Sequence, residues 1–242
     1  MQAYITKLEK ALEETHSIRG ALFCLREFLR PYGAEHLTYV LMLHPSAYKR
    51  GDLMASSTFP MEMWDYYWQS GAMLTDALIE VAPFMAGPTS INLEMVSEQY
   101  RKGSAPHKYF TALVAEGWPM VMGYPVLMGD GTYGIAGLGV VCSRHSLKKL
   151  REPELYLEAA KALQRCMRVN GHFRRYFALT DKEIDTLERM AKGLSAAETA
   201  EILGLKQRTI EMRLQSVRKK LRALTTAEAV FKATAYSILF AK

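Results

Sequence analysis

The sequence predicts two domains of different fold class: an N-terminal α/β/α sandwich around a central antiparallel sheet, and a C-terminal all-α domain of four helices. Its 242 residues suffice for two small domains. Helix-like and strand-like patterns mix up to residue 170, whereas only helical patterns follow residue 178. Residues 1–173 hold 17 basic and 17 acidic side chains, and residues 174–242 hold 14 and 8, so the last part carries the whole net charge of +6. We expect domains at 1–170 and 179–242, joined by a linker at 171–178.

The chain begins with two predicted helices and a strand. Apolar residues over 4–14 recur at the spacing of one helical face. Ser17 is suited to cap a second helix, which we expect to end near Leu29 because Pro31 follows. The apolar, partly β-branched run at 37–43 predicts a strand.

The next elements alternate in type. Residues 53–59 form a weaker strand candidate, and Pro60 opens a helix that is predicted to reach about Ser70. A short helix is expected from Thr75, and another over 108–116.

A hairpin and a long helix complete the first domain. Strands are predicted at 121–127 and 133–142, because the segment M-G-D-G-T between them contains the hairpin dipeptide D-G. An amphipathic helix is predicted over 152–169, and Asn170-Gly171 is suited to end it. These helices and strands together predict the sandwich.

Capping boxes mark the helices of the C-terminal domain. Three segments have the form S/T-x-x-E, in which the first side chain and the glutamate satisfy backbone N–H groups at a helix start: Thr180–Glu183, Ser195–Glu198 and Thr225–Glu228. With a break at Gly204, they predict helices over 180–191, 195–203, 207–222 and 226–239. The short G-L-K connection is typical of a helix-turn-helix.

The third of these helices is predicted to bind DNA. Its apolar residues form one stripe, Ile210, Leu214, Val217 and Leu221, which leaves most of its basic residues exposed. Such a helix enters the major groove with its N-terminal residues near base edges. The residues proposed to read bases are Gln207, Arg208, Glu211 and Met212, with Thr209 beside them; those proposed to contact phosphates are Lys206, Arg213, Arg218, Lys219 and Lys220.

The C-terminal sequence resembles the helix-turn-helix of the LuxR family of transcription factors over about 60 residues. The matching positions are Leu179-Thr180, Glu183, Leu187, Ala191, Gly193, Ser195, Glu198, Ala200, Leu203, Thr209-Ile210 and Lys220-Leu221. The resemblance implies sequence-specific regulation of transcription. A preceding α/β/α domain is similar to that of the quorum-sensing subfamily, which binds acyl-homoserine-lactone signals.

That resemblance implies a ligand site in the first domain. Tyr67 stands where the family has a tyrosine that donates to the ligand's amide carbonyl, and Asp76 stands where an aspartate accepts from the amide N–H. Met63 replaces a tryptophan that donates to the lactone carbonyl, and methionine has no donor. On a 3.6-residue helix, neither Trp64 nor Trp68 points in the direction of Met63. We therefore interpret Trp64 as a core or rim residue.

Two glycines suggest the floor of this pocket. Gly137 and Gly139 share one face of the second hairpin strand, and interior glycine weakens a strand unless something approaches closely. The candidate ligand residues are then Tyr67, Asp76, Met63, Trp68, Gly137 and Gly139. A bulky or non-standard amide-like signal is expected; no other cofactor and no metal are.

Several classes are disfavoured. The six histidines show no metal-ligand spacing, and no hydrolase, zinc-protease or nucleotide-binding motif occurs, so an enzyme is not expected. Three widely spaced cysteines fit a reducing cytoplasm. No apolar run has the length of a membrane span.

The predicted function is a cytoplasmic, homodimeric quorum-sensing regulator that binds a roughly palindromic double-stranded DNA site under control of a small signal molecule. Its dimer contacts are expected on the helices at 152–169 and 226–240. Two alternatives stay open. One is a regulator that acts without a ligand, and the other is an anti-activator that works through dimerisation.

Overall fold

The computed structural model describes residues 2–43, 53–82, 85–127, 135–149 and 153–239. The chain divides into two compact units, unit 1 (residues 1–166) and unit 2 (residues 167–242). The expected linker range, 171–178, includes a short helix, α9 (His172–Tyr176).

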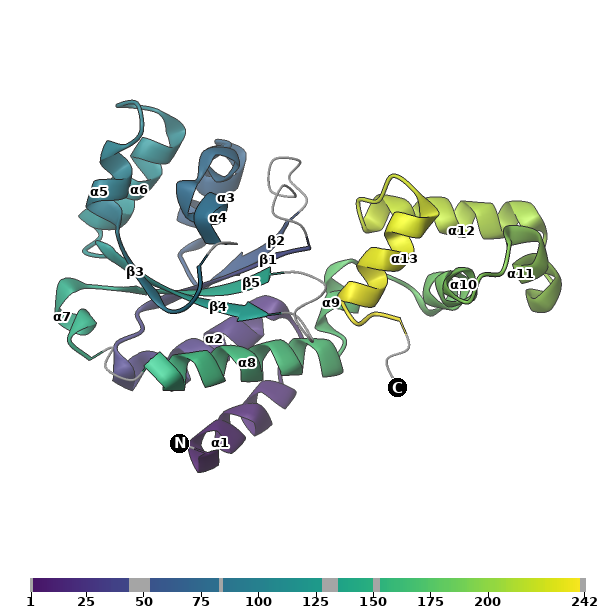
Figure 1. Ribbon diagram of the computed structural model, residues 1–242, viewed down its shortest axis with the longest axis horizontal. Coiled ribbons are helices and arrows are strands. Elements are labelled where there is room, and N and C mark those ends of the chain that lie inside the picture. The colour runs from purple at the N-terminus through teal and green to yellow at the C-terminus, as the bar shows by residue number, and fades with distance from the viewer. Residues whose placement is uncertain (1, 44–52, 83–84, 128–134, 150–152, 240–242) are drawn as a thin grey trace. The chain divides into compact units, whose positions relative to one another are not determined.

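Unit 1 is built on a five-stranded antiparallel sheet (Figure 1). The strands are β1 (His36–Met42), β2 (Met54–Ser57), β3 (Thr89–Asn92), β4 (Met120–Leu127) and β5 (Ile135–Cys142). Their order across the sheet is β2-β1-β5-β4-β3, so the two longest strands lie near the centre. In the central register, Thr38 pairs with Gly139 and Gly139 pairs with Gly123.

Helices cover both faces of this sheet, which confirms the predicted α/β/α sandwich (Figure 1). One face carries α1 (Gln2–Glu13), α2 (Ile18–Leu29) and α8 (Pro153–Val169). The other carries α3 (Met61–Gln69), α4 (Ala77–Val81), α5 (Leu93–Glu98) and α6 (Ala105–Ala115). The short α7 (Arg144–Leu147) follows β5.

Local sequence signals explain the first helical layer. The Ser17 side chain caps α2 by accepting from the backbone N–H of Gly20 at 3.0 Å. Leu22 and Leu25 of this helix are fully buried, and each such side chain contributes about 1.5–3 kcal/mol of transfer free energy. The Tyr124 ring of β4 stacks on Tyr156 of α8 at 5.1 Å between centroids, so this layer of the core is closed by aromatic packing.

Some elements differ from the prediction. Strand β3 and helix α5 were not predicted, because β3 is a four-residue edge strand and Asn92 caps α5 directly after it. The short helix expected from Thr75 is a 3-10 turn, η3 (Ala72–Thr75), followed by α4. The M-G-D-G-T segment lies outside the described residues, although β4 and β5 pair as far as Leu127 and Ile135.

Unit 2 is entirely helical within its described residues, as predicted. After α9 come α10 (Asp181–Ala191), α11 (Ala196–Leu203), α12 (Gln207–Lys220) and α13 (Thr226–Ala235). Complete capping boxes start α10 and α11. At α13, however, Glu228 accepts from the backbone N–H of Leu224 instead of Thr225. Helix α13 ends at Ala235, short of residue 239, because Ser237 takes a left-handed conformation with φ of 54°.

Within the described part of the chain, no helix combines the length and apolar character needed to cross a membrane.

Candidate functional site

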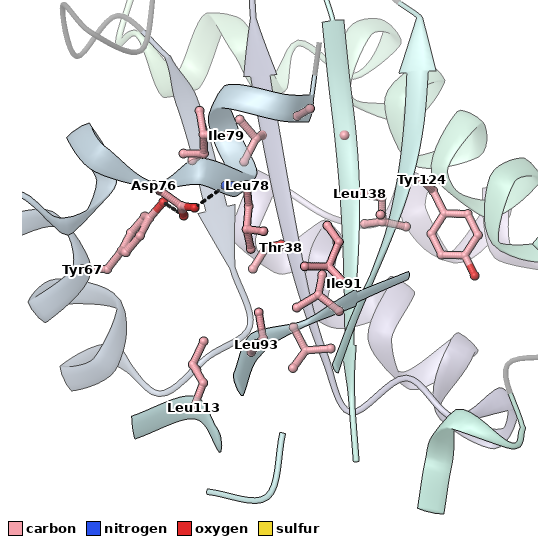
Figure 2. A pocket seen from close by; sticks show the side chains of 18 of the residues that line it. Thr38, Tyr67, Asp76, Leu78, Ile79, Ile91, Leu93, Leu113, Tyr124 and Leu138 are labelled. Carbon is pink, nitrogen blue, oxygen red and sulfur yellow. Dashed lines mark hydrogen bonds between the residues drawn. The ribbon is translucent and has the colours of Figure 1, made fainter. Parts of the chain in front are cut away.

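An apolar cavity of about 120 Å³ lies in unit 1 between the sheet and the helices α3 to α6 (Figure 2). Its walls come from five different strands and from the α3, α4 and α6 layer. Polar side chains are few, and the Tyr67–Asp76 pair stands at one side of the cavity (Figure 2). A concave apolar space with a few convergent polar groups is the usual form of a small-molecule site.

Helix α3 supplies the aromatic wall. Tyr67 is 4% exposed, and Trp64 lies three residues earlier on the same helical face, where its ring stacks on Tyr67 at 5.5 Å. Tyr109 of α6 also packs on Tyr67, at 4.6 Å between ring centroids. Aromatic neighbours from two helices therefore restrain the Tyr67 ring and the position of its hydroxyl.

Asp76 is brought to Tyr67 by the turn after α3. Gly71 adopts a left-handed conformation with φ of 74°, which lets the chain leave α3 and form η3. Asp76 then caps α4, and its Oδ1 accepts from the backbone N–H of Leu78 at 2.7 Å. Its Oδ2 accepts from the Tyr67 hydroxyl at 2.6 Å. The two residues predicted to bind the ligand amide thus form one hydrogen-bonded pair.

Burial raises the pKa values of both Tyr67 and Asp76. Desolvation raises the pKa of Asp76 to about 6, although the hydrogen bonds from Tyr67 and from the backbone of Leu78 and Ile79 oppose the shift. The pKa of Tyr67 rises well above its ordinary value because of burial and because of the neighbouring Asp76 charge. At neutral pH the site therefore contains a buried carboxylate and an intact phenol.

The sheet provides a floor with little side-chain cover. Gly137 and Gly139 both line the cavity. A Cβ atom on Gly137 would meet no atom within 4 Å, whereas one on Gly139 would lie 2.3 Å from Thr38 Oγ1. Gly123, paired with Gly139, is covered by the side chain of Met85. The floor is thus open at Gly137 and covered at the other two glycines.

The remaining predicted ligand residues lie elsewhere. Met63 and Trp68 are half-buried and pack against the core cluster around Tyr67, but they are not among the described residues that line the cavity. Trp64, interpreted as a core or pocket-rim residue, lines the cavity. It lies three residues before Tyr67 on the same helical face, and that spacing was the available signal.

Most of the other lining residues were not predicted, among them Thr38, Met85 and Tyr109. Alternation along β1 places Thr38 on one face, but only the strand register shows that this face is the cavity. Met85 lies between α4 and β3, outside any regular element, so no periodicity marked it.

Unit 2 presents the second candidate site on α12. Gly204 has φ of 62° and turns the chain from α11 into α12. Ile210, Leu214 and Val217 are buried, as the apolar stripe predicted. The helix is therefore fixed on the domain by one face, and its other face is available for contacts.

The predicted base-reading residues lie at the exposed N-terminal half of α12. Gln207, Arg208, Glu211 and Met212 are exposed, and Met212 is 61% exposed despite being apolar. Gln207 Nε2 donates to Glu211 Oε1 at 2.8 Å, a pair four residues apart that orders both side chains. Thr209 is half-buried, and Lys206 precedes the helix as an exposed residue.

The predicted phosphate contacts separate into two groups. Lys219 is exposed, and Arg218 is half-buried. Lys220 donates to Glu183 at 2.8 Å and to the Ala178 carbonyl at 2.7 Å. Arg213 donates to Thr186 at 3.3 Å. The latter two join α12 to the rest of unit 2, so at least part of their role is structural.

Glu183 is the centre of that connection. It accepts from Thr180, from Ser216 and from Lys220. Burial opposes its ionisation, but these hydrogen bonds outweigh burial and lower the pKa of Glu183 to about 2. The ion pair thus persists through the physiological pH range and holds α10 against α12.

Comparison with known proteins identifies unit 2. The GerE family, described as bacterial regulatory proteins of the luxR family, matches residues 178–233. No curated protein sequence matches the chain significantly.

Two solved structures of SdiA share the fold over nearly the whole chain. Escherichia coli SdiA in space group P6522 is 16% identical, with 99% of each chain covered and a TM-score of 0.52. SdiA in complex with octanoyl-rac-glycerol is 13% identical, with 97% of this chain and 95% of that chain covered and a TM-score of 0.55. The N-acylhomoserine lactone dependent LuxR family factor CepR2 from Burkholderia cenocepacia is 15% identical over 69% of this chain and 92% of its own, with a TM-score of 0.46.

The fold, the exposed basic α12 and the matched residues 178–233 agree with one another. Residues 178–233 are therefore a domain of the luxR family of bacterial regulatory proteins.

Proposed function

We propose that the protein is a quorum-sensing transcriptional regulator that binds a roughly palindromic DNA site as a homodimer, under control of a small molecule in the unit 1 cavity. The observation that carries the proposal is the combination of a luxR-family domain with a buried polar pair opening on an apolar cavity. One solved structure of SdiA, which shares the fold, is described as SdiA in complex with octanoyl-rac-glycerol.

The DNA part of the proposal rests on α12. Arg208 suits guanine, Gln207 suits adenine, Glu211 can accept from cytosine, and the Met212 side chain can contact a thymine methyl group. Lys206, Arg218 and Lys219 supply phosphate contacts, which fix position and carry no sequence information. Thr209 lies beside the base-reading residues.

The ligand part rests on the geometry of Asp76. The Asp76 carboxylate accepts from the backbone N–H of Leu78 and from the Tyr67 hydroxyl, and its two oxygens have room for about four hydrogen bonds in all. A buried carboxylate with spare acceptor capacity favours a ligand that brings an N–H donor. Binding stabilises unit 1 by RT ln(1 + [L]/Kd) and biases the conformations available to the dimer.

Selection of binding sites from random duplex DNA tests the first part. We expect the full chain to enrich one palindromic sequence and to lose affinity steeply with salt, as phosphate contacts require. A Lys7→Ala variant, altered at an exposed residue of α1, serves as the control. Failure to enrich any sequence would exclude a DNA-binding regulator and favour an anti-activator.

Mass spectrometry of small molecules that copurify with the chain tests the second part. We expect a compound that is retained by the wild type and depleted in Asp76→Asn. An equal yield from both proteins, or none from either in cells that produce the signal, would favour a regulator that acts without a ligand.

A further inference from the structure

The side chain of Met85 occupies the space above Gly123 on the cavity floor. A Cβ atom on Gly123 would lie 2.5 Å from Met85 Cε and 3.4 Å from its Sδ. Gly123 pairs with Thr89 on β3 and with Gly139 on β5. Met85 therefore stands on the cavity face of the sheet, towards the β3 edge.

Thr38 on β1 pairs with Gly139, so Thr38, Gly139 and Gly123 form one row of paired residues across β1, β5 and β4. Its Oγ1 covers Gly139, so the row formed by Thr38, Gly139 and Gly123 is filled by one hydroxyl and one thioether. In the adjacent row Gly137 pairs with Val40 and Pro125, and the space above Gly137 is open. The space above the sheet is thus occupied on the Met85 side and open above Gly137.

The size of the cavity limits what it admits. Its 120 Å³ is below the range of about 300–1,000 Å³ that is common for drug-sized ligands. A cavity of about 150 Å³ admits a single benzene ring. The expectation of a bulky ligand therefore does not fit the cavity as it is folded.

The polar groups define the chemistry of the occupant. The Tyr67 hydroxyl hydrogen is donated to Asp76, so this pair presents acceptors to a ligand. Thr38 presents a hydroxyl from the sheet side, which can donate to a carbonyl (Figure 2). A ligand that matches both groups carries an N–H donor for the Tyr67–Asp76 pair and a carbonyl acceptor for Thr38. A small, otherwise apolar molecule with these two groups is a secondary amide or a lactam.

We propose that the cavity selects a compact neutral amide of about one ring in size, and that Met85 is the residue that excludes longer chains. This inference rests on the proposed ligand function and specifies its substrate class. A methionine side chain is flexible and unbranched, so it fills irregular space and can be shortened without altering the backbone.

Binding of three probes to the full-length chain tests the inference. The probes are δ-valerolactam, its N-methyl derivative, which lacks the N–H, and the linear octanamide. Dissociation constants are measured by tryptophan fluorescence, since Trp64 lines the cavity. For the wild type we expect valerolactam to bind at least about tenfold more tightly than either other probe, a typical size of discrimination by a pocket.

Variants at position 85 distinguish an effect of side-chain size on binding from a general effect on the stability of the chain. Met85→Ala should bind octanamide about tenfold more tightly than the wild type does. Met85→Leu keeps a similar volume and should retain the wild-type preference. Met95→Ala, altered at a methionine of α5 that is 64% exposed, should behave as the wild type.

The outcomes distinguish this inference from the function on which it rests. Equal affinity of the wild type for valerolactam and octanamide, unchanged in Met85→Ala, would overturn the size limit and leave a ligand-controlled regulator intact. Equal affinity for valerolactam and its N-methyl derivative would overturn the amide assignment. Binding of no probe by wild type, Met85→Ala or Met85→Leu would overturn this inference, whereas ligand control is decided separately by the copurification experiment.

Discussion

The Tyr67 hydroxyl donates to Asp76 over 2.6 Å in a buried setting, and this bond joins α3 to the first residue before α4. The bond directs the phenol hydrogen towards the carboxylate and leaves the phenol oxygen as an acceptor. Any ligand that requires a donor from Tyr67 must first displace Asp76 from it. The pair is therefore both a structural contact and the polar part of the site.

Removal of this bond should destabilise unit 1. Tyr67→Phe leaves the Asp76 carboxylate with one donor fewer, and hydrogen bonds to charged groups contribute about 1.5–3 kcal/mol. We expect a decrease of that size in the free energy of unfolding and a further increase in the pKa of Asp76. Urea denaturation and an NMR titration of the carboxyl carbon measure the two effects. Tyr66→Phe, at the exposed neighbour, should change neither.

The raised pKa of Asp76 predicts a pH dependence of stability. The folded chain holds this proton up to about pH 6, whereas the unfolded chain releases it near 3.8. Between these values the unfolded state binds fewer protons, so the free energy of unfolding falls as pH rises. A shift of this size corresponds to about 3 kcal/mol at most.

Asp76→Asn isolates that contribution from those of other groups. The amide oxygen can accept from Leu78, and the side chain stays neutral at every pH. Relative to the wild type, the variant should become more stable as pH rises from 4 to 7, measured by denaturation at each pH. A difference between the two proteins that stays constant with pH would show that Asp76 titrates normally.

The two floor glycines should respond differently to the same change. A Cβ atom on Gly139 would lie 2.3 Å from Thr38 Oγ1, so Gly139→Ala should destabilise the chain by about 1–3 kcal/mol. Gly137→Ala meets no atom within 4 Å and should leave stability nearly unchanged, while it reduces the cavity and weakens ligand binding. Thermal denaturation and ligand titration of both variants make the comparison. Equal loss of stability would contradict the described floor.

Substitution of two adjacent lysines on α12, Lys219 and Lys220, should affect different properties. Lys219→Ala removes an exposed charge, so it should weaken binding to all DNA sequences and lower the slope of log affinity against log salt by about 1. Lys220→Ala removes the partner of Glu183, so it should destabilise unit 2 by about 3 kcal/mol. Anisotropy titrations over a range of salt concentrations, with denaturation curves, test both. If Lys220→Ala were as stable as the wild type, the Glu183 contacts would not hold α12 in place.

If α12 reads bases, a substitution at Arg208 should change sequence specificity. Arg208→Ala should lose discrimination at one base pair, about 1–3 kcal/mol, while binding to other substituted sites changes little. Competition with duplexes that differ at single positions of the selected site measures this. A uniform loss across all duplexes would reassign Arg208 to the phosphate backbone.

Elements with local signals were predictable, and the cavity was only partly so. Ser17, Thr180 and Ser195 cap helices where the sequence indicated, because a cap depends on neighbours within one turn. The cover of Gly139 by Thr38 depends on strand register, which joins residues about a hundred positions apart. The position of Met85 over Gly123 depends on an irregular segment. No pattern in the chain encodes either contact locally.

Helix α12, which we propose to bind DNA, is held by contacts within residues 178–239. Glu183 and Lys220 join α10 to α12, and the buried Lys232 donates to the carbonyls of Leu221 and Arg222 at the end of α12. A cation at this end also complements the helix dipole. These contacts lie within unit 2 and hold α12 on its own domain. If α12 reads DNA as proposed, recombination of this domain with a different sensor gene would transfer the DNA-reading residues together with the contacts that position them. The specificities for signal and operator could then diverge independently.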